Sequence, residues 1–160
     1  MIDGHHRVTV LLELGCKFVP AYQVDYLKSD IEVKTWYPLV LGSKKRLFSL
    51  LRESGVSFYC SGCGENLIAL NSGVFYLSKG GDEVMNALLG KIRLDYAFTR
   101  EIAVDLALQG KISAALLFKP VSKAEVVERA LKGKLFPPKT TQHIIPGKPR
   151  GVNVPIDVLR

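Results

Sequence analysis

The stretch Ile2-Asp3-Gly4-His5-His6-Arg7 runs directly into an apolar segment, and it decides the fold that we expect for the whole chain. Asp3 suits the N-cap of a helix, because its side-chain oxygen can accept hydrogen bonds from amides of the first turn. Gly4 has no Cβ and lets a ligand approach the backbone closely. The apolar residues within 8–14 are spaced to bury one helix face, and Gly15 suits the end of that helix. We therefore predict a strand end, a tight turn and the start of a helix.

A helix that begins in this way presents free N–H groups and the positive end of its dipole, which together attract anions. His5, His6 and Arg7 add hydrogen-bond donors and charge at the same place. Gly4 and these three residues are therefore a candidate phosphate site. The alternative is a plain turn and cap followed by surface histidines, and physical chemistry alone leaves both interpretations open.

Two further stretches carry motifs, Lys34-Thr35-Trp36-Tyr37-Pro38 and Phe136-Pro137-Pro138-Lys139-Thr140-Thr141-Gln142-His143. With Asp-Gly-His-His-Arg before them, they resemble the ParB/sulfiredoxin-like superfamily. Within it they look most like the free L-serine kinases, which comprise archaeal ADP-dependent enzymes and ATP-using relatives from siderophore pathways. The resemblance extends from Ile2 to Leu159. It implies a mixed α+β domain, with a mixed sheet and flanking helices, that makes O-phospho-L-serine from free L-serine with ADP or ATP and Mg²⁺.

The resemblance also implies roles for the first motif. In that superfamily the turn and helix hold nucleotide phosphates, which assigns nucleotide binding to Gly4, His5, His6 and Arg7. Asp3 would then orient the serine hydroxyl or bind Mg²⁺, and it is the candidate catalytic residue. No protein cluster for the metal is expected, since Mg²⁺ would be carried by the phosphates.

The other two motifs would form the serine site. Trp36, the only tryptophan, matches an aromatic residue that lines the substrate pocket in the family. Thr140, Thr141 and His143 would contact substrate or nucleotide, and the two prolines at 137–138 are expected to hold this stretch extended. The alternatives are core packing for the tryptophan and a solvated polar loop for the others.

Members of this family carry an N-terminal segment before the first motif, with a glutamate that acts as general base. The sequence as given begins at Met1, shortly before Asp3. We therefore expect a single kinase domain over residues 1–160 that lacks this segment, binds nucleotide and phosphorylates serine poorly. The competing hypothesis is a non-catalytic ParB-like module that binds nucleotide or DNA and serves regulation.

The composition fits one folded domain, with 160 residues of which 48% are hydrophobic and 23% charged. The net charge of +7 favours an anionic partner. Nucleotides and nucleic acid both qualify, but only Lys44-Lys45-Arg46 forms a basic run, so nucleic acid is the less expected partner. Without a signal peptide or an apolar run of about 20 residues, we expect a cytoplasmic protein that does not contact membranes. The oligomeric state is left open.

The three cysteines, Cys16, Cys60 and Cys63, are an odd number, which fits a reducing compartment. Cys60 and Cys63 form a C-x-x-C pair, which is half of a zinc site or a redox pair. Zinc requires four ligands, and the sequence has no second such pair. We predict that no structural zinc binds here.

Hydrophobic periodicity predicts the remaining elements. Strands are expected at 17–26, 31–36, 56–60, 66–70, 74–77, 91–96 and 113–118. Helices are expected at 44–53, 80–89, 99–109 and 122–132, the last with a capping box at its start. The first two strands would pair as a hairpin, and the run at 113–118 would be a central strand. The tail at 144–160 would be a loop followed by an edge strand at 152–158.

Overall fold

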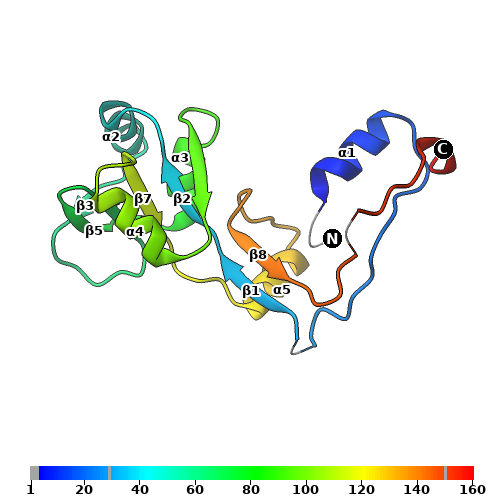
Figure 1. Ribbon diagram of the computed structural model, residues 1–160. Helices are drawn as coiled ribbons and strands as arrows, with labels where there is room; N and C mark the ends of the chain where they lie inside the picture. Colours follow the sequence, from blue (N-terminus) through cyan, green and yellow to red (C-terminus); the bar gives the residue numbers. More distant parts are fainter. Residues whose placement is uncertain (1–3, 29, 150) are drawn as a thin grey trace. The chain divides into compact units, whose positions relative to one another are not determined.

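The computed structural model describes residues 4–28, 30–149 and 151–160. The chain divides into two compact units. Unit 1 comprises Met1–Glu32 and His143–Arg160, and unit 2 comprises Val33–Gln142. Unit 1 holds α1 (His5–Glu13) and the 3₁₀ helix η1 (Ile156–Val158) (Figure 1). The strands are β1 (Glu32–Thr35), β2 (Tyr37–Val40), β3 (Phe58–Tyr59), β4 (Leu67–Leu70), β5 (Gly73–Leu77), β6 (Leu94–Ala97), β7 (Ala114–Leu117) and β8 (Thr141–Ile144). The other helices are α2 (Lys44–Glu53), α3 (Gly81–Leu88), α4 (Arg100–Leu108) and α5 (Lys123–Leu131).

Unit 2 is built on a six-stranded sheet with the strand order β3-β5-β4-β7-β2-β6 (Figure 1). Neighbouring strands in this sheet pair antiparallel, whereas we expected a mixed sheet. The strand β7 lies between β4 and β2, and all four of its residues are buried. The prediction of a central strand buried on both sides is therefore confirmed.

Alternation along the strands divides the core between the two faces of this sheet. Ile68 and Leu116 belong to the cluster that packs against α2 and α3. Ala69 and Leu117, each the next residue in its strand, belong to the cluster that packs against α4. The sheet is thus covered on both sides, and the predicted fold class, a mixed α/β domain with flanking helices, is confirmed.

In unit 2, helix α2 and the start of helix α5 form where the sequence patterns predicted them. Helix α2 has the predicted bounds, and its three inward leucines are buried. In α5 the predicted capping box is present, since Ser122 Oγ accepts from the Glu125 amide at 3.2 Å and the Ser122 amide donates to Glu125 Oε2 at 2.8 Å. No residue of α5 is buried, however, and Leu131 is 83% exposed.

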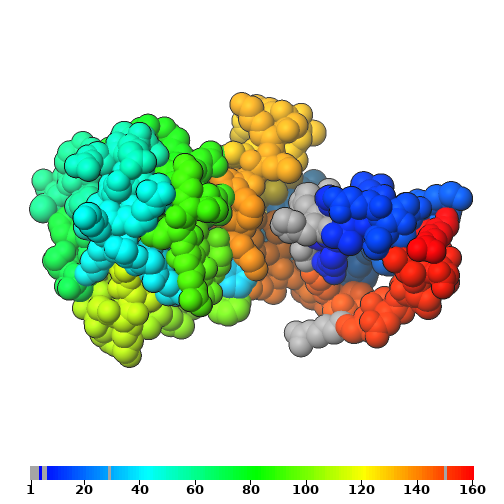
Figure 2. Space-filling model, turned by 90° about the horizontal axis from the view of Figure 1, so that it is seen from above, coloured from blue at the N-terminus to red at the C-terminus, as the bar shows by residue number. Residues whose placement is uncertain are grey.

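The second sheet has two strands, β1 and β8, and the boundary between the units passes through both. The expected hairpin partner of β1, residues 17–26, is not a strand. Its backbone finds other partners, because the amides of Lys17 and Phe18 both donate to the Leu159 carbonyl, at 2.8 and 3.0 Å. The end of the chain and α1 accordingly lie side by side (Figures 1 and 2).

Two further strand assignments need correction. The strand β2 was missed, because Pro38 suggested a strand end. Within β2, only Leu39 and Val40 pair with β7. Pro38 therefore has no partner residue in β7, and the N–H that proline lacks is tolerated at such a position. The expected edge strand at 152–158 is replaced by η1. None of the described helices is long and apolar enough to cross a membrane.

Candidate functional site

The turn before α1 places an arginine against a glycine. Gly4 has a φ of +94° and is the N-cap of α1, and its carbonyl accepts from the Val8 amide at 3.0 Å. A Cβ on Gly4 would lie 3.3 Å from Arg7 Nη2, so the guanidinium of Arg7 folds back against this glycine. The backbone angle favours glycine, whereas the end of the flexible Arg7 side chain could shift by a few tenths of an ångström to admit a Cβ. The turn therefore brings a cationic side chain to the helix N-terminus, as an anion site requires.

The predicted cap residue differs from the observed one. We expected Asp3 as the N-cap, and the structure has Gly4 there. Asp3 itself lies outside the described residues, as do the side chains of His5 and His6. Their predicted catalytic and phosphate-binding roles stay predictions.

The end of α1 follows the prediction, but its burial does not. Gly15 has a φ of +73° and the Cys16 amide donates to the Leu11 carbonyl at 2.9 Å, which closes the helix. Leu12 is 64% exposed and Leu14 is also exposed, so the expected apolar face is wrong. Leu11 is half-buried instead.

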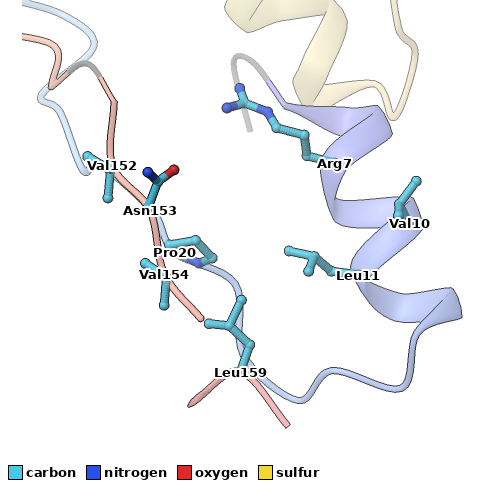
Figure 3. Close-up of a pocket in the computed structure, with 8 residues that line it drawn as sticks. All are labelled: Arg7, Val10, Leu11, Pro20, Val152, Asn153, Val154 and Leu159. Atoms are coloured by element: carbon cyan, nitrogen blue, oxygen red, sulfur yellow. The ribbon is translucent and has the colours of Figure 1, made fainter. Parts of the chain in front are cut away.

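A cavity of about 510 Å³ opens beside α1 within unit 1 (Figure 3). Its lining is mostly apolar and comprises Arg7, Val10, Leu11, Pro20, Val152, Asn153, Val154 and Leu159. In Figure 3, Leu11 points from the helix toward Val154 and Leu159, and Arg7 lies at the N-terminal end of the helix. Sequence reasoning missed this cavity, because it assigned the last residues to an edge strand.

Trp36 belongs to a surface aromatic cluster rather than to the core of unit 2. Its ring centroid lies 4.5 Å from that of Phe98 and 6.4 Å from that of Tyr96, the latter in an edge-on arrangement. Trp36 is half-buried, and Phe98 is 61% exposed. Burial, and secondarily the charge of Asp95, raises the pKa of the Tyr96 phenol. The tryptophan therefore remains accessible to a small ligand.

The motif at 136–143 turns back toward Trp36. The Thr140 amide and hydroxyl both donate to the Pro137 carbonyl, at 3.3 and 2.8 Å, and Lys139 has a φ of +60°. The path through the prolines is thus a tight turn and not the extended run that we expected, although Thr141 continues into β8. The Trp36 amide donates to the Thr140 carbonyl at 3.4 Å. The structure therefore brings Trp36 and Thr140 together, and their substrate-binding roles stay predictions.

His143 lies in unit 1, where Tyr26 is its partner. The Tyr26 hydroxyl and His143 Nε2 are 2.9 Å apart, and the two ring centroids are 5.5 Å apart. Burial raises the pKa of the Tyr26 phenol, so this group stays protonated at neutral pH and can donate to Nε2. Sequence reasoning missed Tyr26, because its alternating neighbours suggested a strand.

The cysteine pair belongs to unit 2. Cys60 and Cys63 are exposed free thiols in the loop between β3 and β4. The loop rests on Tyr76, since a Cβ on Gly62 would lie 3.5 Å from that ring. Among the residues that the structure describes, no group of three or more histidine, cysteine or acidic side chains could hold a metal ion.

Comparison with known proteins identifies the family. No family model matches the chain. It is 32% identical to the ATP-dependent L-serine kinase of Staphylothermus marinus, over 100% of this chain and 72% of that protein. It is 30% identical to the ADP-dependent L-serine kinase of Thermococcus kodakarensis, over 99% of this chain and 72% of that protein. The chain belongs to the L-serine kinase family.

The three-dimensional structure agrees with this membership. A free serine kinase solved in complex with AMP superimposes with a TM-score of 0.85 at 28% identity, over 100% of this chain and 73% of that one. The resemblance to free L-serine kinases that the three motifs indicated is therefore confirmed. The fold class that this resemblance implied is confirmed as well.

Proposed function

We propose that this protein transfers a phosphoryl group from ATP or ADP to the hydroxyl of free L-serine and forms O-phospho-L-serine. The observation that carries the proposal is the similarity to two L-serine kinases along essentially the whole chain. Because one of these relatives is named for ATP and the other for ADP, both donors are candidates here. In the transfer, serine Oγ attacks the terminal phosphorus, the donor O–P bond breaks, and ADP or AMP leaves.

The nucleotide would occupy unit 1. The N-terminus of α1 and the guanidinium of Arg7 would hold its phosphates, with His5 and His6 as further donors. The adjacent cavity of about 510 Å³ has the size of a typical ligand site, and its apolar lining suits the faces of a flat base. The Asn153 side chain supplies a polar group within that lining.

Mg²⁺ fits this arrangement as an ion that the nucleotide carries. The described residues offer no cluster of three or more ligands, and Mg²⁺ is commonly held by one or two carboxylates, waters and substrate phosphates. Asp3, outside the described part, is the candidate protein ligand. When bound, Mg²⁺ would neutralise charge on the phosphate oxygens.

The serine would bind at the Trp36 cluster of unit 2. The Trp36 ring gives a half-buried apolar wall, and the hydroxyls of Thr140 and Thr141 supply polar contacts. His143, with its ring held by Tyr26, would contact substrate or nucleotide. Asp3 would orient the serine hydroxyl and accept its proton. We propose that residues 1–160 act as one kinase domain, because the similarity to the two L-serine kinases extends over essentially the whole chain.

The test is product formation by the chain of residues 1–160. L-serine, Mg²⁺ and either ATP or ADP are incubated with the protein, and O-phospho-L-serine is measured by mass spectrometry. We expect product with at least one donor and none with L-alanine, which lacks the hydroxyl. Nucleotide binding without any O-phosphoserine would refute the kinase function and favour the non-catalytic ParB-like module.

A further inference from the structure

One end of the unit 2 sheet carries cations from several connections. Because β2 pairs antiparallel with β6 and β7, and β4 pairs antiparallel with β7, the ends of β2 and β4 lie beside the starts of β6 and β7. The connections at this end are 41–43, 71–72, 89–93 and 109–113. With the first turn of α2 they form the basic end, whose cations are Lys44, Lys45, Arg46, Lys91, Arg93 and Lys111. Neither these connections nor this first turn contain aspartate or glutamate.

The connection between β2 and α2 contacts each of the other connections. The Leu41 amide donates to the Arg93 carbonyl at 3.0 Å, and the carbonyl of the next residue accepts from the Ser113 hydroxyl. Just after this connection, Lys44 Nζ donates to Asn71 Oδ1 at 2.7 Å. The basic end is therefore one continuous surface of unit 2, although its cations come from three separate stretches of the sequence.

Helix stability accounts for only some of these cations. Lys91 and Lys111 follow the C-termini of α3 and α4, where a positive charge complements the helix dipole. Lys45 and Arg46 lie instead in the first turn of α2, where the same dipole disfavours positive charge. Both side chains are exposed, and so is Arg93. A local stabilising role therefore leaves the charges of Lys45, Arg46 and Arg93 unexplained.

Carboxylates do not neutralise the basic end. At the other end of the sheet, Lys119 Nζ lies 3.3 Å from Glu65 Oε2. Within the described residues, no such ion pair involves a cation of the basic end. The nearest carboxylates in sequence are Asp95 of β6 and Asp105 of α4, which lie outside these connections. The basic end therefore presents positive charge that suits a partner with several negative groups.

The residue types of the basic end favour a phosphate backbone over other polyanions. Its connections contain no phenylalanine, tyrosine or tryptophan. Protein interfaces are commonly anchored by aromatic side chains, and single-stranded nucleic acid stacks its bases on them. Duplex phosphates need only cations and hydrogen-bond donors. Donors of the second kind are present in Ser43, Asn71, Ser72 and Gln109.

We propose that the basic end binds the phosphodiester backbone of duplex nucleic acid, with little dependence on base sequence. This interaction goes beyond the proposed kinase function and uses none of the residues assigned to it. Nucleic acid was the less expected partner because the sequence shows a single basic run, at 44–46. The fold adds to this run the cations of 89–93 and 109–113, which sequence order alone separates.

The experiment measures duplex binding by fluorescence anisotropy. The chain of residues 1–160 is titrated into a short labelled DNA duplex and an RNA duplex of the same length, at several KCl concentrations from about 50 to 200 mM. Two double variants remove charge from different connections, Lys45→Ala/Arg46→Ala and Lys91→Ala/Arg93→Ala. The matched control is Lys119→Ala/Lys132→Ala, which removes the same charge from exposed lysines elsewhere in unit 2. Melting temperatures and serine phosphorylation are measured in parallel.

We expect the parent to bind a duplex at low salt, and each double variant to bind at least about 10-fold more weakly. The plot of log affinity against log salt concentration should become shallower by about 2 in each, since a lost phosphate contact removes about 0.9 from the slope. The control should resemble the parent. Lys45→Ala/Arg46→Ala should melt no lower than the parent, because alanine favours the helix and the removed charges opposed its dipole. A merely structural role would not give weaker binding at unchanged stability.

The two duplexes distinguish DNA from RNA as the source of the phosphates, and binding of either supports the proposal. Four results would overturn it: no duplex binding by the parent at about 50 mM KCl, an equal loss in the control, a loss in only one of the two double variants, or tighter binding of polyglutamate than of either duplex. The last result would identify an acidic protein as the partner. Serine phosphorylation should be unchanged in both double variants, and its absence from the parent would refute the kinase function without affecting the duplex measurement.

Discussion

Unit 2 and unit 1 differ in the interactions that stabilise their folded chains. In unit 2 both faces of a six-stranded sheet are covered by helices, and Leu116 at the centre is 0% exposed. In unit 1 extended segments connect α1 and η1, and Leu12 and Phe18 are largely exposed. There the backbone amides of residues 17 and 18 share the Leu159 carbonyl. Apolar burial therefore stabilises unit 2, whereas unit 1 depends more on hydrogen bonds between its two chain segments.

The difference in construction matches a difference in the candidate ligands. In unit 2, the Trp36 ring lies against the rings of Tyr96 in β6 and of Phe98 just after this strand. Next to it is the turn at 137–140, and Arg129 fixes the chain before this turn through its hydrogen bond to the Leu135 carbonyl. This arrangement suits the selection of one small amino acid. The Gly4 turn of unit 1 combines a helix N-terminus with an open apolar cavity, which suits a larger nucleotide. In the proposed function, the packed sheet of unit 2 would support the site that selects serine, and the start of α1 would support the site that holds the nucleotide phosphates.

The largest expected effect tests the contrast in burial. Leu116→Ala should lower the free energy of unfolding by about 2–5 kcal/mol, because it removes buried methyl groups and leaves a cavity. Leu12→Ala, the same substitution at an exposed position of unit 1, should change it by less than about 0.5 kcal/mol. Urea denaturation of the two variants measures both values. Equal losses would show that the contrast between the units is not one of apolar burial.

The next effect concerns the fixed turn of unit 2. Arg129→Ala should lower the free energy of unfolding by about 1–2 kcal/mol, since it removes a half-exposed ion pair, a hydrogen bond and an aromatic contact. Because the turn loosens, the KM for serine should rise while the nucleotide affinity stays unchanged. Thermal denaturation and steady-state kinetics check the two parts. An unchanged KM for serine in a folded variant would remove the positioning role.

The smallest effect concerns the cap of α5. Ser122→Ala should destabilise the protein by about 1 kcal/mol at neutral pH, because it removes an N-cap oxygen. Hydrogen bonds from the backbone and then the hydroxyl of Ser122 lower the pKa of Glu125 below its ordinary 4.5. A carboxylate with a lowered folded pKa stabilises the protein above its unfolded pKa, and this contribution is lost as the pH falls through the folded value. The difference in melting temperature between parent and variant should therefore shrink from pH 7 to pH 3. A difference that grows in acid would contradict the capping geometry.

Sequence patterns predicted the elements of unit 2 because each pattern there has a buried face. Helix α2 and strand β7 form where their apolar periodicity predicted them, because the leucines and alanines of these elements pack into the core. The same reasoning failed at 17–26 and 152–158 of unit 1. There the alternating residues have no sheet to join, because the backbone donors of the first segment are directed to Leu159.

The candidate sites were predictable only in part, for a comparable reason. Gly4 and Trp36 could be found because a glycine before a helix and a lone tryptophan carry local signals. The contact between Lys139 Nζ and the Trp36 ring, 4.9 Å from the ring centroid, could not be predicted, since it depends on the fold of the intervening chain. Tyr26 was missed likewise, because it meets His143 across a long sequence separation.

The central claim is that unit 1 binds the nucleotide and unit 2 binds the serine, and two variants test it directly. For Arg7→Ala and Trp36→Ala, the nucleotide dissociation constant is measured by calorimetry and the KM for serine by steady-state kinetics. Arg7→Ala should weaken nucleotide binding by roughly 1.5–3 kcal/mol, as expected for a charge-assisted contact, with little change in the KM for serine. Trp36→Ala should raise the KM for serine at least about 10-fold and leave nucleotide binding intact. Unchanged nucleotide affinity in Arg7→Ala, or an unchanged KM for serine in Trp36→Ala, would contradict this division.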